Sequence, residues 1–312
     1  MKKSLLALAA LTAFAGVASA QSSVTLYGRL DTSIGKNAGS GNKVMQNGSG
    51  SRFGVMGVED LGGGLKARFQ LEHRFNADTG ADSNAGGRFW HGRSVVGLEG
   101  GFGQVLLGRD YTPAFLGSQL AADPWGWDTV AASTFTVGVT GGGIAPVRTD
   151  SSITYRISAS GISFGAQIGE ATDQFNNTVD KPTSLFLGYA GGPFSIGLGL
   201  ENPGGANDKW TTVNGGFTIG AIKLTGLIGN GTTNANVKVK STFVSATMTM
   251  GQGELRAAFG KRKNGSATTI SGLGLGYHYA LSKRTTLYAD YARNSKLATQ
   301  KTAYDVGIKH NF

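Results

Sequence analysis

The sequence contains no cysteine, little proline and little charge. Of its 312 residues none is Cys, 6 are Pro and 15% are charged, whereas about 25% are charged in ordinary soluble domains. Without cysteine a disulfide scaffold is excluded. After residue 20, no apolar run approaches the roughly 20 residues of a membrane-spanning helix. A helical membrane protein is therefore excluded, and an ordinary soluble enzyme is disfavoured.

Glycine, in contrast, is abundant. The chain has 51 Gly, more than twice the usual share of about 7%, and they follow no collagen-like period. The length alone allows one or two domains. The glycines are spread through the chain together with apolar residues, so this is not a low-complexity tract.

Residues 1–20 have the layout of a secretory signal peptide. The segment opens with MKK, continues with an apolar stretch and ends in the small residues ASA. We expect cleavage after Ala20, which leaves residues 21–312 as one mature unit. Loss of the two lysines lowers the formal net charge from +10 to +8. Export of a chain without cysteine is compatible with a bacterial envelope.

Apolar and polar residues alternate with a period of two along most of the remaining chain. Near its start, Val24, Leu26 and Leu30 share one parity, whereas Arg29 and Asp31 share the other. The same alternation recurs in many later segments, and no window has a convincing helical period. A period of two indicates β-strands with one apolar face. We therefore predict an all-β fold.

Short glycine-rich turns alternate with long polar connections, which predicts an up-and-down antiparallel sheet with two different ends. At about 10 residues per spanning strand and about 8 per connection, the chain after residue 20 accommodates roughly 16 strands. The strand near 221 is among the weakest, because Leu227 falls on the polar parity. The sixteen predicted strands begin near residues 24, 51, 65, 93, 104, 152, 162, 184, 194, 210, 221, 240, 254, 272, 285 and 303.

Closing such a sheet into a barrel removes its unpaired edges, as a lipid environment requires. Sixteen strands leave an aqueous channel, whereas about eight would be filled by side chains. The alternative is a large soluble sandwich or solenoid of the periplasm. Its dry core could use only the apolar parity, and the other parity carries many arginines. The final segment alternates up to Phe312, and a terminal Phe resembles the assembly signature of outer-membrane barrels.

These segments together resemble the general diffusion porins of Gram-negative bacteria, most closely the β-proteobacterial (Burkholderiales) type. The resemblance implies a homotrimer of 16-stranded antiparallel transmembrane β-barrels in the outer membrane, surrounded by lipid and lipopolysaccharide. It also implies a water-filled channel for passive diffusion of small hydrophilic solutes and ions, narrowed by a loop after the fifth strand that folds inward. The matching segments are SVTLYGRLD (23–31), SRFGVMGVEDLGGGLKARFQLE (51–72), RSVVGLEGGFGQVLLGRDYTP (93–113), the surroundings of DSSITYR (150–156), ALSKRTTLYADYA (280–292) and VGIKHNF (306–312).

Selectivity in such a pore comes from charges at its narrowest place, where the low-dielectric wall focuses their potential. Arg29 and Arg52 face inward by alternation and occupy positions similar to basic constriction residues of the family. Arg109 and Arg148 flank the predicted constriction loop, about 110–146, at similar positions. Alternation alone puts Arg109 on the lipid parity, so a bend is required there. Arg74 and Arg256 are assigned to the general lumen wall.

The acidic side of the constriction is predicted to come from the loop itself. Its carboxylates are Asp110, Asp123 and Asp128. A loop of this length in a compact barrel is usually functional. Asp123, in the DPWG segment, is the first candidate for the acidic tip, and Asp128 is the second. Because the arginines outnumber the aspartates, we expect the pore to prefer anions.

Two other functions are open to such a barrel. An outer-membrane hydrolase needs a nucleophile or activated water near a histidine and a carboxylate. His73 and His310 fall on the lipid parity, and His278 faces inward without an evident partner in the sequence. A substrate-specific channel would need a track of aromatics or clustered lysines. We expect no enzyme activity, no cofactor, no metal site and, despite the basic composition, no nucleic-acid partner.

Overall fold

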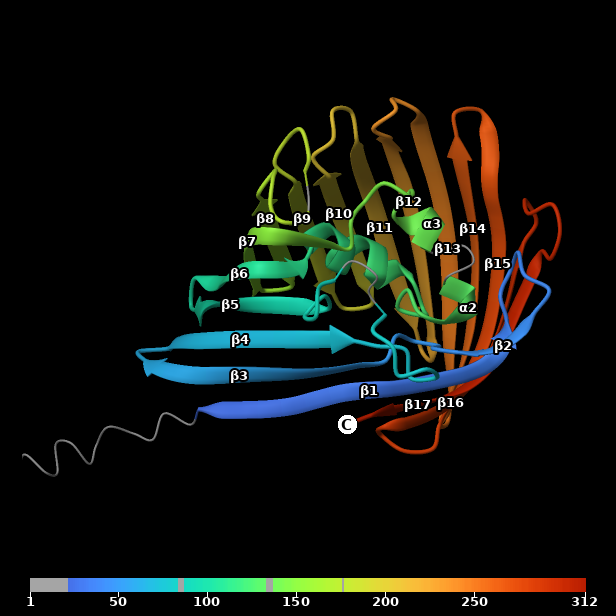
Figure 1. Ribbon diagram of the computed structural model, residues 1–312, viewed down its shortest axis with the longest axis horizontal. Coiled ribbons are helices and arrows are strands. Elements are labelled where there is room, and N and C mark those ends of the chain that lie inside the picture. Colours follow the sequence, from blue (N-terminus) through green and yellow to red (C-terminus); the bar gives the residue numbers. More distant parts are fainter. Residues whose placement is uncertain (1–21, 84–86, 133–136, 176) are drawn as a thin grey trace, which may run out of the picture.

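The computed structural model describes residues 22–83, 87–132, 137–175 and 177–312. The predicted signal peptide lies outside the described residues. Figure 1 shows a wall of long strands with short helices inside it. The strands are β1 (Ser23–Lys36), β2 (Lys43–Gln46), β3 (Arg52–Gly62), β4 (Leu65–Arg74), β5 (Arg93–Gly100), β6 (Gly103–Tyr111), β7 (Arg148–Ala159), β8 (Ile162–Gly169), β9 (Thr183–Gly191), β10 (Phe194–Asn202), β11 (Lys209–Ile219), β12 (Ile222–Thr232), β13 (Lys238–Met250), β14 (Gly253–Asn264), β15 (Ala267–Ala280), β16 (Thr285–Asn294) and β17 (Thr302–Asn311).

The sheet is antiparallel and closes on itself. Each long strand pairs with its neighbours in the chain, and β1 joins the two ends. The first half of β1 pairs with β3, from Ser23 opposite Val58, and its second half pairs with β17, from Arg29 opposite Asn311. Within the described residues, sixteen long strands thus form the barrel that the sequence predicted. The short strand β2, which was not predicted, adds to the end of β1.

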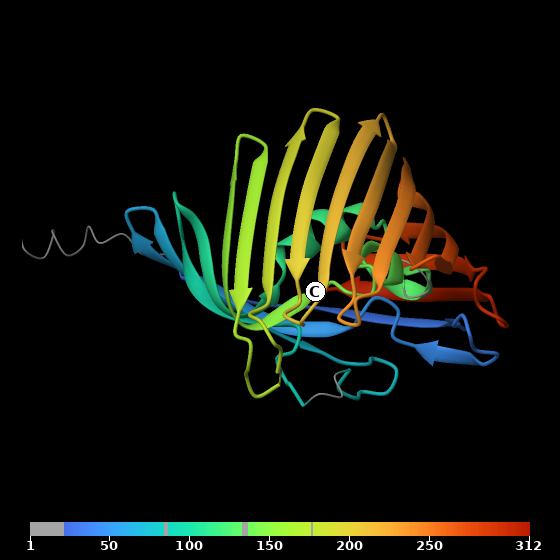
Figure 2. The same ribbon diagram turned by 90° about the horizontal axis from the view of Figure 1, so that it is seen from above.

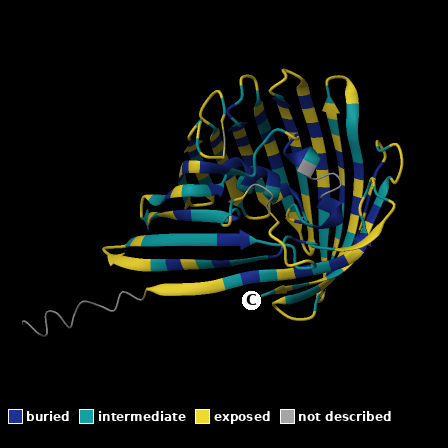
Figure 3. Ribbon diagram, viewed as in Figure 1, coloured by how far each residue is buried: buried dark blue, intermediate teal, exposed yellow. Residues whose placement is uncertain are grey.

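The alternation in the sequence becomes the two faces of this wall. Along the strands, exposed and buried residues follow one another in stripes (Figure 3). On β1, Val24 is 71% exposed, whereas Asp31 is 1% exposed on the lumen side. Lipid solvates the apolar outer face, so exposed apolar side chains are favourable there. Tyr189 and Tyr277 are also exposed on this face, as is typical of the aromatic residues at the membrane interfaces of outer-membrane barrels.

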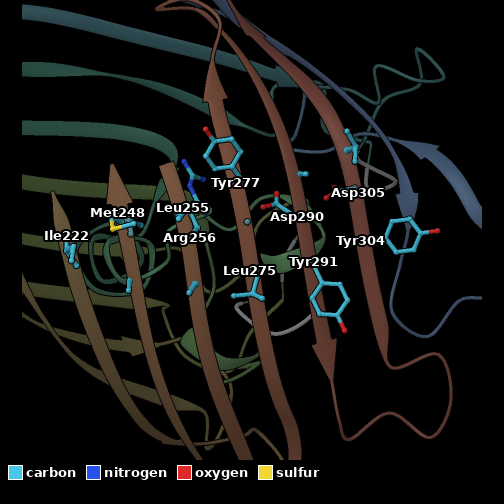
Figure 4. A pocket seen from close by; sticks show the side chains of 16 residues that line it. Ile222, Met248, Leu255, Arg256, Leu275, Tyr277, Asp290, Tyr291, Tyr304 and Asp305 are labelled. Atoms are coloured by element: carbon cyan, nitrogen blue, oxygen red, sulfur yellow. The ribbon is translucent and has the colours of Figure 1, made fainter. Parts of the chain in front are cut away.

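An apolar hollow of about 710 Å³ lies on the wall from β12 to β17. Figure 4 shows its lining side chains rising from neighbouring strands, among them Leu275, Tyr291 and Tyr304. These three residues share the outward parity and are exposed. The hollow therefore belongs to the lipid side of the wall and is separate from the lumen.

The barrel closes at a seam where glycine is required. The N–H of Gly28 donates to the carbonyl of Phe312 at 3.0 Å, and the N–H of Phe312 donates back at 3.1 Å. A Cβ atom on Gly28 would lie 2.3 Å from Cζ of Phe312 and 2.7 Å from the carbonyl oxygen of Arg52. Only glycine lets the terminal ring cross β1 at this distance without displacement.

The connection between β6 and β7, residues 112–147, runs inside the barrel (Figures 1 and 2). It contains η1 (Phe115–Leu120), α2 (Thr129–Ala131) and α3 (Val137–Thr140). Helix η1 contacts β9 to β11, α3 contacts β12 to β14, and α2 contacts β15 to β17. The segment, hereafter the inward loop, thus crosses the lumen as predicted. No helix in the described part of the chain is long and apolar enough to span a membrane.

The inward loop packs on apolar residues that interrupt the polar parity of the wall. Leu227 and Phe243 are buried in one cluster with Ala122, Trp125 and Val130 of the loop. This packing explains why Leu227 departs from the polar alternation of its strand. Its side chain faces the lumen, but the loop covers it and removes it from water.

Buried hydrogen bonds tie the loop to the wall at several points. Glu201 of β10 is 4% exposed and accepts from the Thr112 hydroxyl and, at 2.9 Å, from Nε2 of Gln119. The indole N–H of Trp125 donates to Asp290 of β16 at 2.7 Å. Trp210 of β11 donates to the Thr140 carbonyl at 3.1 Å. Such bonds are costly to break inside a protein because they leave buried polar groups unpaired.

Candidate constriction site

The tip of the inward loop and the facing wall enclose a cavity of about 600 Å³. Its charged lining residues come from six strands and the loop. The cations are Arg29 of β1, Arg52 of β3, Arg74 of β4, Arg148 of β7, Arg256 of β14 and Lys309 of β17, and the carboxylates are Asp123 and Asp128. Sequence-distant charges therefore meet at one level of the lumen.

Sheet register places three arginines side by side. Arg29 stands opposite Arg52 in the β1–β3 pair, and Arg52 stands opposite Arg74 in the β3–β4 pair. Like charges directly opposite one another are unfavourable, and backbone oxygens offset this. The Ser49 carbonyl accepts from Nη1 of Arg29 at 3.2 Å and from Nη2 of Arg52 at 3.0 Å, while the Gly50 carbonyl accepts from Nε of Arg52 at 2.9 Å.

A tyrosine joins the fourth arginine to this group. The guanidinium of Arg148 lies 4.0 Å from the ring centroid of Tyr111, a cation–π contact. The Tyr111 hydroxyl accepts from Nη2 of Arg148 and, at 2.7 Å, from Nη2 of Arg74. Tyr111 also stacks on Phe115 at 5.7 Å between ring centroids. The phenol thus fixes two guanidiniums at the mouth of the inward loop.

Asp128 is the loop carboxylate that faces the arginines. Its Oδ2 lies 3.1 Å from Nη1 of Arg29 and 3.9 Å from Nη2 of Arg52. Burial within the barrel raises the pKa of the Asp128 carboxyl, and Arg52 and Arg29 act in the opposite direction. The flanking Trp127 and Thr129 have φ of 64° and 68°. Left-handed backbone costs about 1–3 kcal/mol at such residues and clusters at functional sites.

Asp123 has a different environment, although it also lines the cavity. Its Oδ1 accepts from the backbone N–H of Trp125 at 3.1 Å, and its Oδ2 accepts from that of Trp127 at 2.6 Å. The carboxylate therefore shapes the turn that carries Asp128. Of the two predicted aspartates, the second candidate, Asp128, forms ion pairs with Arg29 and Arg52, and Asp123 lines the same cavity.

Contrary to prediction, Arg109 and Asp110 are not among the lining residues of this cavity. Arg109 pairs in register with Ser94 and keeps the outward parity of its strand. Its guanidinium meets Asp150, which also accepts from Arg88 at 2.6 Å. The pairing of β6 with β7 is irregular at this point, between Gly108 and Asp110, but Arg109 lines a neighbouring cavity with Arg148 and not the constriction cavity.

Asp110 points inward but is enclosed. It is fully buried between the guanidiniums of Arg93 at 2.7 Å and Arg156 at 2.8 Å. Two arginines neutralise this carboxylate and hold the base of the inward loop. It therefore contributes little free negative charge to the constriction.

Sequence reasoning missed three of the cations. Arg74 and Arg256 had been assigned to the general lumen wall, and Lys309 had not been singled out. All three lie on the inward parity of their strands, which was visible in the sequence. Their height in the barrel depends on strand register, which a single strand does not reveal.

His278 has a partner, contrary to the expectation from sequence. Its Nε2 lies 3.1 Å from Oδ1 of Asp290 on the adjacent strand, and its ring stacks on Tyr288. Asp290 also accepts from Trp125 of the inward loop. His278 and Asp290 are thus buried next to the point where Trp125 attaches the inward loop to the wall.

A closed transmembrane barrel whose wall carries cations opposite a carboxylate of an inward loop defines a channel protein of the outer membrane. The chain belongs to the Gram-negative porin family, whose model matches residues 7–298. It is 34% identical to Outer membrane porin protein 32 of Delftia acidovorans and 31% identical to an outer membrane porin protein of Bordetella pertussis, each over the full length of both chains. The members of this family are channels of the bacterial outer membrane.

Solved structures agree with this assignment. An "anion-selective porin from Comamonas acidovorans" superposes with a TM-score of 0.78 at 28% identity, covering 94% of this chain and all of the other. The OmpT protein of Vibrio cholerae shares the fold, with a TM-score of 0.72 at 16% identity over 93% of this chain and 99% of its own. The porin fold predicted from the sequence is therefore confirmed.

Proposed function

We propose that this porin passes small hydrophilic solutes by passive diffusion and prefers anions. The observation that carries the proposal is the charge around the constriction cavity, where six cationic side chains face two carboxylates. Two further carboxylates form ion pairs with cavity arginines: Glu72 pairs with Arg74, and Glu254 pairs with Arg256. The balance stays positive when these two are included. The anion-selective porin of Comamonas acidovorans, as its title describes it, lends further support.

The geometry gives this charge its effect. Guanidiniums from five strands meet at one level of the lumen. The low-dielectric wall and the surrounding lipid focus their field across a narrow opening. The positive ring lowers the electrostatic energy of an anion in the constriction and raises that of a cation, so anions meet the smaller barrier to passage. The inward loop adds a counter-charge at Asp128, so the field also has a component across the pore.

The reversal potential of the reconstituted channel tests the proposal. In a planar bilayer under a KCl gradient, we expect the sign that corresponds to chloride permeating faster than potassium. A potential of the opposite sign would contradict anion preference while leaving the channel function intact. Conductance should also rise in proportion to bulk salt. Saturation with one solute would instead favour the substrate-specific alternative.

The proposal includes no catalysis. The pairing of His278 with Asp290 is the arrangement most similar to a hydrolytic site, and the Asp290 carboxylate is shared with the Trp125 indole. Its neighbours are the buried ring of Tyr288 and the inward loop. We therefore assign this pair to holding the loop in place.

We further propose a homotrimer that contacts lipopolysaccharide. In outer-membrane barrels the long loops face outward from the cell, and four exposed lysines lie at that end on the outer face of β13 and β14. Lys240 stands opposite Lys263 in register. Such a patch suits the phosphates of the outer leaflet. The four residues are Lys238, Lys240, Lys261 and Lys263.

Native mass spectrometry of the detergent-extracted protein tests both points. We expect three chains per particle and bound lipopolysaccharide that falls severalfold when the four lysines are changed to Gln. Lys283→Gln, at the short-turn end, serves as the control and should retain the lipid. A monomeric particle, or equal lipid in both variants, would refute the corresponding point.

A further inference from the structure

A second cluster of polar side chains lies at the rim of the barrel, where β4 ends and β5 begins. His73 is the last but one residue of β4, and the connection that follows turns back on itself, with Phe75 bridged to Asp82. His91 lies near the end of the same connection. The fold therefore brings together three residues whose spacing in the sequence matches no recognised metal-binding motif.

The potential ligand atoms of His73, Asp82 and His91 all lie within 4.8 Å of one another. Nδ1 of His91 is 3.7 Å from Oδ1 of Asp82. Ligand atoms around a tetrahedral Zn²⁺ ion, each about 2.1 Å from the metal, stand about 3.4 Å apart. Closing the cluster around an ion therefore needs side-chain shifts on the order of 1 Å, which the exposed Asp82 can supply.

The hydrogen bonds behind the two imidazoles are those that metal-binding histidines usually make. Nδ1 of His73 lies 2.6 Å from the Phe89 carbonyl, and Nδ1 of His91 lies 3.2 Å from the Arg88 carbonyl. A backbone carbonyl can only accept, so the Phe89 bond favours the His73 tautomer that leaves the lone pair on Nε2. In His91 the Ser83 hydroxyl, 3.1 Å from Nε2, can accept the ring proton instead, which leaves Nδ1, the atom that faces Asp82, as the ligand atom. Such contacts orient imidazoles and raise their affinity for metals.

Aromatic side chains shield the same place from water. The His73 ring stacks on Phe89 at 4.2 Å between centroids and lies 5.4 Å from Phe53, and only 7% of His73 is exposed. His91 meets His73 edge to face at 5.8 Å. A half-enclosed site with two nitrogens and one carboxylate strengthens charge-dependent contacts, because the local dielectric constant is lower than in water.

We propose that His73, Asp82 and His91 bind a divalent transition-metal ion of the zinc, copper or nickel class. Two imidazoles and one carboxylate match the preferences of these ions rather than those of magnesium or calcium. Three protein ligands leave a further position for water, so the ion would be exchangeable. Once bound, it would link the connection between β4 and β5 to the end of β4. None of the three residues lines the constriction cavity.

Metal titration of the purified full-length assembly, after treatment with a chelator, tests this site. Calorimetry should show one Zn²⁺ per chain in the wild type. The spectrum of the Cu²⁺ form should show splitting from two nitrogen ligands in electron paramagnetic resonance. We expect His73→Gln and His91→Gln each to weaken Zn²⁺ binding at least tenfold and to remove one nitrogen from the Cu²⁺ signal.

His310→Gln provides the matched control, because His310 lies on β17, outside the cluster, and its Nδ1 bonds the Thr285 hydroxyl. This variant should bind Zn²⁺ as the wild type does. Single-channel conductance equal to that of the wild type verifies that each variant is folded. Absence of Zn²⁺ binding to the folded wild type, or equal binding in His91→Gln, would overturn the proposal and leave the cluster as aromatic packing.

Discussion

Replacing both Arg29 and Arg52 with glutamate is expected to abolish the anion preference of the channel. The cavity has six cationic and two acidic lining residues, and this double variant shifts its formal charge by four units, to zero. At 4 Å in bulk water, one unit charge changes the energy of an ion by about 1 kcal/mol. Four units at lumen distances therefore change the anion-to-cation permeability ratio by roughly tenfold or more.

The measurement is the reversal potential under a KCl gradient, compared with that of Lys283→Glu plus Arg284→Glu. The control changes the net charge by the same amount at the exposed turn between β15 and β16, away from the cavity. It should leave the potential near that of the wild type. Equal shifts in the two variants would show that overall charge, and not the constriction, sets selectivity.

Replacing Trp125 with alanine is expected to loosen the inward loop and widen the pore. Trp125 is 4% exposed, belongs to the buried cluster beneath the loop and donates to Asp290. Loss of a buried indole typically costs about 3–5 kcal/mol. A loss of about 3 kcal/mol raises the fraction of loops displaced from the wall by about two orders of magnitude. Single-channel recordings should show larger and noisier currents, while the barrel itself stays folded.

Trp90→Ala is the matched control for this prediction. Trp90 packs edge to face on Phe89 at the outer rim, with 4.8 Å between ring centroids, so its removal deletes the same side chain outside the lumen. We expect currents like those of the wild type. If the two tryptophan variants conduct alike, the Trp125 anchor does not hold the constriction.

The strands of the wall were predictable because their signal is local and repeated. Each predicted strand start falls within five residues of the first residue of an observed long strand. The short strand β2 escaped prediction, since four mostly exposed residues carry no clear alternation and depend on the end of β1 for pairing. Leu227 looked like a defect in its strand because the cover that buries it comes from a loop about ninety residues earlier.

The constriction was predictable only in part. Parity alone correctly turned Arg29 and Arg52 toward the lumen, and both lie in the cavity. Parity also argued against Arg109, and the structure keeps that side chain outside the cavity lining. The choice between Asp123 and Asp128 depended on the path of the loop, because backbone amides occupy the carboxylate of Asp123.

The sequence by itself determined the wall: period-two alternation assigns each side chain to lipid or to water without knowledge of any distant contact. It also determined the excess of positive charge on the inner face. Only the tertiary structure decided the height at which these charges meet and the aspartate that opposes them. Both depend on strand register and on the docking of one long loop, which are set by contacts between residues far apart in the chain.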